Sequence, residues 1–209
     1  MSTTITKSIQ LTTTGTSGAA TLVGSTLNIP QYSGGGASGI HNLMNQGTGI
    51  VINAQITTSA LSTTAQVANR MVFYPFIPAN TFTCSNLFIN VFSAVAGANA
   101  KILIYSNVNG NPSSLLYESA NLDCSTTGVK TATTSFTFNA GTIYWFAYWG
   151  NTTPQVYTMP ATNMYMIRVN GISPSSMLLA AYTFGAAPDP VVATTTSNQA
   201  VPFIGITIA

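Results

Sequence analysis

The segment Thr142–Trp149 (TIYWFAYW) carries an apolar or aromatic side chain at nearly every position. Because successive side chains of an extended strand point to opposite faces, both faces of this segment would be apolar. One face would hold Ile143, Trp145, Ala147 and Trp149, and the other Tyr144, Phe146 and Tyr148. Both faces need a cover, which predicts a strand in the interior of a layered β-structure.

The remainder of the chain also favours strands. Thr, Ser, Asn and Gly dominate, and no window shows the sustained i, i+3, i+4 apolar spacing of a helix. Strand-length segments separated by turn signals recur from about Arg70 onward, at the spacing typical of a sandwich. The clearest are Asn86–Val95, Ala100–Tyr105, Ser114–Tyr117, Thr131–Phe138 (with Phe136 and Phe138 on one face), Met164–Val169 and Val201–Ile208, with turns at Asn109-Gly110 and Asn170-Gly171. We predict an all-β chain with an antiparallel, jelly-roll-like β-sandwich.

Charged side chains make up only 4% of the 209 residues, against about 25% in an average soluble domain. Nucleic-acid binding needs clustered lysines and arginines, but Lys7, Arg70, Lys101, Lys130 and Arg168 are scattered singly. No apolar run approaches the roughly 20 residues of a membrane-spanning helix, and no signal peptide is visible. We therefore expect neither a nucleic-acid partner nor membrane insertion.

Few residues are available for catalysis. His41 is the only histidine, and we expect a polar hinge residue there, with an ion bound by symmetry-related copies as the alternative. A glycosidase needs two facing carboxylates, whereas the only acids are Glu118, Asp123 and Asp189. Ion pairs or hydrogen bonds are the expected roles of Glu118 and Asp123, with Lys101, Lys130 and Arg168 as candidate partners. We predict no enzyme activity, cofactor or metal, and a polysaccharide depolymerase is the enzymatic alternative.

Two cysteines, Cys84 and Cys124, are too few for a disulfide framework. We expect buried free thiols. A bridge between them stays open, because the sequence does not give the separation of their Cα atoms.

The N-terminal third differs from the rest of the chain. No charged residue occurs from Ser8 to Asn69, and large side chains are rare. Ordering costs about 1–2 kcal/mol per residue, and the few apolar residues present are not enough to offset it in a single chain. We therefore predict a stem over residues 1–36 that is stabilised by identical copies, a junction over 37–69 and a sandwich head over 70–209. The stem contacts and anchor would be Ile9, Leu11, Leu22, Val23, Leu27, Ile29 and Tyr32.

Two stretches resemble a known class of proteins. Thr12–Gly36 (TTTGTSGAATLVGSTLNIPQYSGGG) resembles the N-terminal segment of many tailed-bacteriophage fibre and appendage proteins. Gly97–Ser119 and Thr127–Trp149 look like the β-sandwich domains of phage tail-fibre and adhesin tips. The resemblance implies a homotrimeric virion component, assembled in the host cytoplasm, whose stem binds other capsid or tail proteins and whose head faces the host. The single short stem favours a head fibre or short spike, and a capsid decoration protein without host binding is the alternative.

Host glycan is the ligand that such a head would recognise, and aromatic rings beside amides suit uncharged sugars. The candidate contacts are Tyr148, Trp149, Asn151 and Tyr157, around the turn YWGNTTPQVY. The loops Asn107–Ser113 and Gly185–Pro190 are further candidates or plain turns. For the two tryptophans a core position is the favoured interpretation, because Trp145 and Trp149 share the core-facing side of their strand with Ile143.

Overall fold

The computed structural model describes residues 10–12, 20–29, 51–53, 61–159, 177–192, 194–197 and 199–209, and it divides the chain into two units, Met1–Asn42 and Leu43–Ala209. The predicted strand Met164–Val169, the turn at Asn170-Gly171, and Ile9, Tyr32, His41 and Arg168 lie outside these residues. No helix occurs in the described part, so the all-β prediction is confirmed.

The first unit contains a three-stranded sheet in the order β1-β3-β2, formed by β1 (Gln10–Thr12), β2 (Thr21–Val23) and β3 (Thr26–Asn28). β2 and β3 form an antiparallel hairpin through Gly24, whose φ of 62° favours glycine. β1 pairs with β3 in parallel. Leu22 pairs with Leu27, and Leu27 pairs with Leu11, so three leucines are in register across the sheet.

The second unit is a sandwich of two sheets in which every strand pairing is antiparallel. The seven-stranded sheet has the order β10-β8-β13-β6-β15-β16, with β9 also paired to β8. Its strands are β6 (Arg70–Phe76), β8 (Asn99–Val108), β9 (Asn111–Glu118), β10 (Leu122–Asp123), β13 (Tyr144–Gly150), β15 (Met177–Ala181) and β16 (Thr195–Ser197).

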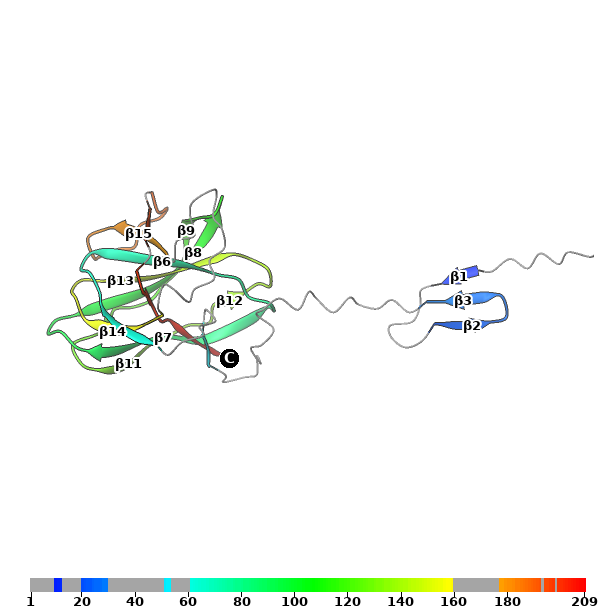
Figure 1. Ribbon diagram of the computed structural model, residues 1–209, viewed down its shortest axis with the longest axis horizontal. Coiled ribbons are helices and arrows are strands. Elements are labelled where there is room, and N and C mark those ends of the chain that lie inside the picture. Colours follow the sequence, from blue (N-terminus) through cyan, green and yellow to red (C-terminus); the bar gives the residue numbers. More distant parts are fainter. Residues whose placement is uncertain are drawn as a thin grey trace, which may run out of the picture. The chain divides into compact units, whose positions relative to one another are not determined.

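The eight-stranded sheet has the order β17-β14-β7-β18-β4, with β11 and β12 paired to β7 and β5 paired to β14. Its strands are β4 (Val51–Asn53), β5 (Ser62–Ala65), β7 (Phe82–Ser93), β11 (Gly128–Thr133), β12 (Thr137–Phe138), β14 (Gln155–Met159), β17 (Val201–Pro202) and β18 (Gly205–Ile208). Figure 1 shows β6, β13 and β15 in one layer and β7, β11 and β14 in the other.

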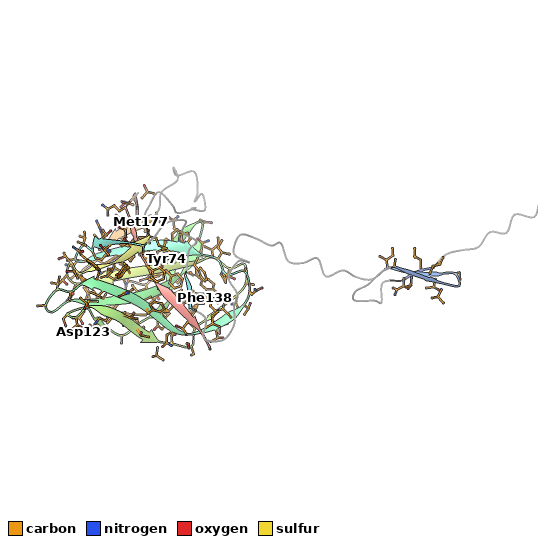
Figure 2. The ribbon with its side chains drawn as sticks, turned by 60° about the horizontal axis from the view of Figure 1, so that its bottom comes forward. Tyr74, Asp123, Phe138 and Met177 are labelled. Carbon is orange, nitrogen blue, oxygen red and sulfur yellow. The ribbon has the colours of Figure 1, made fainter. Side chains whose placement is uncertain are left out.

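The main core fills the space between the two sheets. Tyr74, Phe146 and Tyr148 enter it from the seven-stranded sheet, and Leu87, Ile89 and Val91 enter it from the long strand β7. Phe138 contacts Phe76, Phe82, Phe136, Tyr144 and Phe146 with ring centroids 4.8–5.7 Å apart. Figure 2 places Tyr74 and Phe138 in this interior and Asp123 at the periphery of the sandwich.

Several local predictions are confirmed. All seven residues of β13 are buried, with Tyr144, Phe146 and Tyr148 facing the main core and Trp145, Ala147 and Trp149 facing a second apolar cluster. The Asn109-Gly110 turn joins β8 to β9, and both residues have positive φ values, 50° and 77°. Phe136 and Phe138 contact each other with their ring centroids 4.8 Å apart.

Two boundaries differ from the predictions. The predicted strand Thr131–Phe138 is divided, since β11 ends at Thr133 and β12 begins at Thr137, although both pair with β7. The sandwich begins before residue 69, where the predicted junction ends. β4 pairs with β18 and β5 pairs with β14, so parts of residues 37–69 belong to the eight-stranded sheet.

Candidate functional site

Two of the four residues predicted to contact glycan have no exposed surface. Trp149 and Tyr148 are both 0% exposed, and they lie on opposite faces of β13. Trp149 packs against the ring of Phe184, with centroids 5.0 Å apart, and its Nε1 donates a hydrogen bond to the carbonyl of Tyr182 at 3.0 Å. The possible ligand contact of Trp149 and Tyr148 is therefore contradicted, and the core interpretation holds for both Trp145 and Trp149.

The cover over Trp149 is the segment Tyr182–Val192, here called the strap. The outward side of the seven-stranded sheet carries a second apolar cluster that includes Phe73, Tyr105, Trp145 and Trp149. Tyr182, Phe184, Ala187 and Val191 of the strap pack against this cluster. The sandwich therefore has a third layer on this side, built from a segment with no regular secondary structure.

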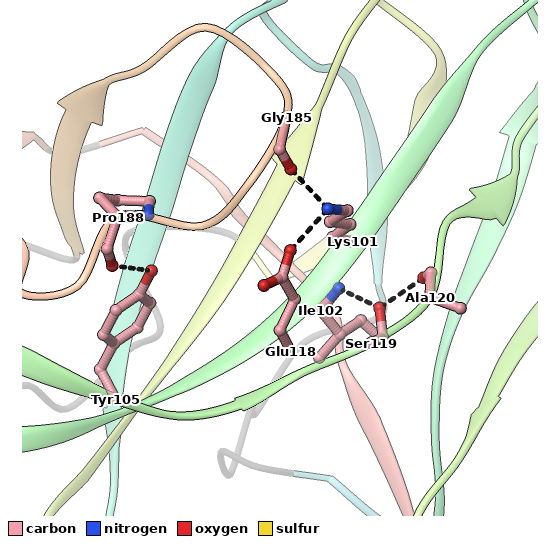
Figure 3. A network of polar contacts seen from close by, with 8 residues as sticks. All are labelled: Lys101, Ile102, Tyr105, Glu118, Ser119, Ala120, Gly185 and Pro188. Carbon is pink, nitrogen blue, oxygen red and sulfur yellow. Dashed lines mark hydrogen bonds and ion pairs between the residues drawn. The ribbon is translucent and has the colours of Figure 1, made fainter.

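Lys101 fastens the strap at one point (Figure 3). Its Nζ lies 2.5 Å from Glu118 Oε1 and 2.5 Å from the carbonyl oxygen of Gly185. The same ammonium lies 5.5 Å from the ring centroid of Phe184 and 5.9 Å from that of Trp149. Lys101 thus joins β8, β9 and the strap through one partly buried charge, and the predicted pairing of Glu118 with a lysine is confirmed.

Further hydrogen bonds hold the strap along its length. Near its start, the Asn69 side chain accepts from Phe184 N at 2.9 Å. Farther along, Tyr105 Oη donates to the Pro188 carbonyl at 3.1 Å, and Asp189 Oδ1 accepts from Leu115 N at 2.9 Å. These contacts give Asp189 a structural role, and the predicted tip loop Gly185–Pro190 is part of a fastened layer.

The other two residues predicted to contact glycan, Asn151 and Tyr157, differ in whether their side chains are free to meet a ligand. The Asn151 side chain is engaged, since its Oδ1 accepts from Asn99 N at 2.7 Å and its Nδ2 donates to Gly97 O at 3.1 Å. Tyr157 is half-buried on β14 and meets the ring of Phe92 edge to face, with centroids 5.8 Å apart. Of the four residues, Tyr157 is therefore the one whose ring is partly exposed and lies outside the core.

Tyr157 belongs to a larger apolar surface that the sequence analysis missed, here called the aromatic face. It lies on the outward side of the eight-stranded sheet and comprises Phe88, Phe92, Val129 and Tyr157, together with Phe203, which contacts the Phe88 ring and also packs against the main core. Phe92 is 52% exposed and Val129 is 58% exposed. Phe88 lies 6.2 Å from Phe203 between ring centroids, and its ring lies so closely over Gly205 that an added Cβ would be 2.0 Å from Cζ. The alternation of Phe88, Asn90 and Phe92 along β7 is the sequence pattern from which this surface could have been predicted.

The three-stranded sheet of the first unit also exposes apolar side chains. Leu22 is 61% exposed, Val23 is 76% exposed and Ile29 is 40% exposed, while Leu27 is half-buried. Adjacent residues of β2 point to opposite faces, so Leu22 and Val23 leave one apolar side chain exposed on each face of this small sheet among the described residues. These exposed and half-buried side chains all belong to residues that were predicted to form the stem.

The third acid, Asp123, has a structural hydrogen-bond partner. Asp123 is exposed, and its pKa is lowered by hydrogen bonds to its carboxylate from the Ser125 side chain and from Ser125 N, the latter at 2.8 Å. Within the described residues, no group of three or more His, Cys, Asp or Glu side chains could hold a metal ion. The described part of the chain also has no helix long and apolar enough to cross a membrane.

Both cysteines are buried and free, as expected. Burial raises the pKa of Cys84 to about 11 and that of Cys124 to about 11. Because the thiolate is the reactive form, about one thousandth of each thiol would be ionised at about pH 8.

We therefore expect a thiol reagent such as iodoacetamide to leave both cysteines unmodified in the native protein at about pH 8, and to modify both after denaturation. Intact mass spectrometry without reductant measures the number of modified groups. Two modified groups in the native protein, or none after denaturation, would contradict the buried free thiols.

The chain matches no known protein-family model, and no curated protein is significantly similar to it in sequence.

Proposed function

We propose that this protein is a non-enzymatic structural component of a bacteriophage particle, a homotrimeric fibre or spike. In this proposal, the N-terminal unit forms a shared stem and attaches to capsid or tail proteins, while the sandwich forms the head. The resemblance of Thr12–Gly36 to phage appendage proteins supports the placement on a virion. The chain's low charge also supports an assembly protein, because buried subunit contacts are depleted of charged residues.

The observation that carries the proposal is the exposure of the N-terminal apolar residues. Leu22 is 61% exposed and stands in register with Leu27, while Val23 is 76% exposed on the other face. A sheet of three strands with three residues each has too little apolar surface to offset its own ordering cost. Copies of the same sheet would cover these side chains and supply the missing burial.

The first experiment replaces Leu22 with aspartate in the full chain. We expect the trimer to dissociate, or to form only at concentrations at least about tenfold higher, because each assembled stem would bury three unpaired carboxylates. Sedimentation velocity measures the oligomeric state. Near-ultraviolet circular dichroism of the head should remain unchanged.

Ser25→Asp is the matched control, because it adds the same charge at the turn between β2 and β3. We expect this variant to remain trimeric. A full complement of trimers for Leu22→Asp, or a wild-type protein that is monomeric and fully folded, would refute the proposed stem.

Recognition of a host glycan stays a prediction from the resemblance. Fewer of the predicted contact residues can reach a glycan, since Trp149 and Tyr148 are buried and the Asn151 side-chain amide is hydrogen-bonded within the protein. The alternative of a capsid decoration protein differs in predicting no host ligand. Incubation of the full-length protein with host cells, followed by measurement of the bound fraction, distinguishes the two.

A further inference from the structure

The two outward faces of the sandwich differ in their cover. The strap covers the seven-stranded sheet and its second apolar cluster. On the eight-stranded sheet, the described residues provide no such layer over Phe92 and Val129, which stay 52% and 58% exposed. An apolar surface of this kind on a folded domain marks a site of interaction.

The two sheets also differ in charge. The described strands of the seven-stranded sheet contain Arg70, Lys101, Glu118 and Asp123. Lys130 is the single charged residue in the described strands of the eight-stranded sheet. It stands opposite the buried Ile89, and its Nζ donates to Thr126 Oγ1 at 2.5 Å, so its charge belongs to the β11 edge. Among the described residues, the aromatic face itself carries rings, Val129, amides and hydroxyls and no charged group.

We propose that the aromatic face is where the heads of one assembly contact one another, so that its occupant is a second copy of this chain. The inference rests on the proposed homotrimer and extends it from the stem to the head. Residues near a rotation axis meet their own copies, and a charged residue there would repel itself. A face that combines aromatic rings with a lack of charge meets this requirement and has the composition of a subunit interface.

The packing of the aromatic face leaves no open space for a small ligand between Phe88 and Gly205. Small-molecule sites are concave, whereas the ring of Phe88 fills the space above Gly205. Phe88 and Phe203 form one ring pair, and Phe92 and Tyr157 form a second across β7 and β14. Val129 stands opposite Asn90 on β11, next to Phe92, and so extends the surface to a third strand. The rings and Val129 thus span three neighbouring strands, which suits contact with another protein surface.

The test introduces a lysine into the aromatic face of the full chain, as Phe92→Lys and separately as Val129→Lys. Val192→Lys is the matched control, since Val192 is 83% exposed on the strap, away from this face. Mass photometry across a dilution series measures the concentration at which the trimer dissociates. We expect each face variant to raise that concentration at least about tenfold and Val192→Lys to leave it unchanged. High salt should partly restore the face variants, because it screens the introduced charges.

Dissociation of both face variants at the wild-type concentration, with an unchanged circular dichroism spectrum, would overturn the head contact. The result for Leu22→Asp is independent of this outcome. If Leu22→Asp dissociates and the face variants do not, the stem proposal stands and the head contact fails. If only the face variants dissociate, the head contact stands and the stem fails. Loss of binding to a panel of neutral oligosaccharides in Phe92→Lys, with association intact, would assign the face to sugar and overturn a second copy as its occupant.

Discussion

Replacing Trp149 with alanine should reduce the free energy of unfolding of the head by about 3–5 kcal/mol. The indole is completely buried between β13 and the strap, and it donates to the Tyr182 carbonyl. Its removal would leave a cavity in the second apolar cluster and take away the surface on which Phe184 packs. Urea unfolding followed by circular dichroism measures the change. The expected signature is lost stability, and reduced ligand binding with wild-type stability would contradict the buried position.

Tyr148→Phe is the matched control on the neighbouring residue. Tyr148 is equally buried, its hydroxyl has no hydrogen-bond partner among the residues that the structure describes, and burial raises the pKa of that hydroxyl far above its usual range. Removing a buried hydroxyl that makes no hydrogen bond should leave stability unchanged or raise it slightly. A loss comparable to that of Trp149→Ala would show that Tyr148 Oη has a partner.

Lys101→Met should lower the free energy of unfolding by about 1–3 kcal/mol and loosen the strap. Methionine keeps most of the apolar stem but removes the donor shared by Glu118 and the Gly185 carbonyl. The carboxylate would then be left partly buried without its counter-charge. Urea unfolding gives the overall change, and hydrogen exchange of the Phe184 amide reports the loosening, because this amide donates to Asn69.

Two further variants separate the charge effect from general damage. Lys130→Met removes a lysine whose hydrogen bond to Thr126 is exposed, and it should change stability by less than about 0.5 kcal/mol. Adding Glu118→Gln to Lys101→Met removes the unpaired carboxylate and should restore part of the loss. Equal losses for Lys101→Met and Lys130→Met would contradict the role of Lys101 in fastening the strap.

The sequence predicted the parts of the fold that depend on local patterns. The two apolar faces of β13 follow from alternation alone, and the Asn109-Gly110 turn follows from the backbone freedom of these two residue types. In both cases the residues that carry the sequence pattern and the element that the pattern predicts lie within about ten residues of each other along the chain.

The features that could not be predicted depend on contacts between residues far apart in the sequence. Alternation assigned Trp149 to a face but did not reveal that the strap, more than thirty residues later, covers that face. The strap contains Gly185, Ala186, Ala187 and two prolines, which resemble an exposed loop in sequence. The membership of β4 and β5 in the sandwich was hidden for the same reason, since their partners are β18 and β14.

The same long-range pairing has a consequence during synthesis. Leu87 on β7 pairs with Ile206 on β18, so 119 residues (206 − 87) separate the two partners. At a translation rate of about 5–20 residues per second, β7 waits about 6–24 s for this neighbour. The Thr- and Asn-rich nascent chain carries few charges to keep it soluble in that interval. Yield in the host should therefore depend on chaperone capacity and on temperature during translation, even when the finished head is stable.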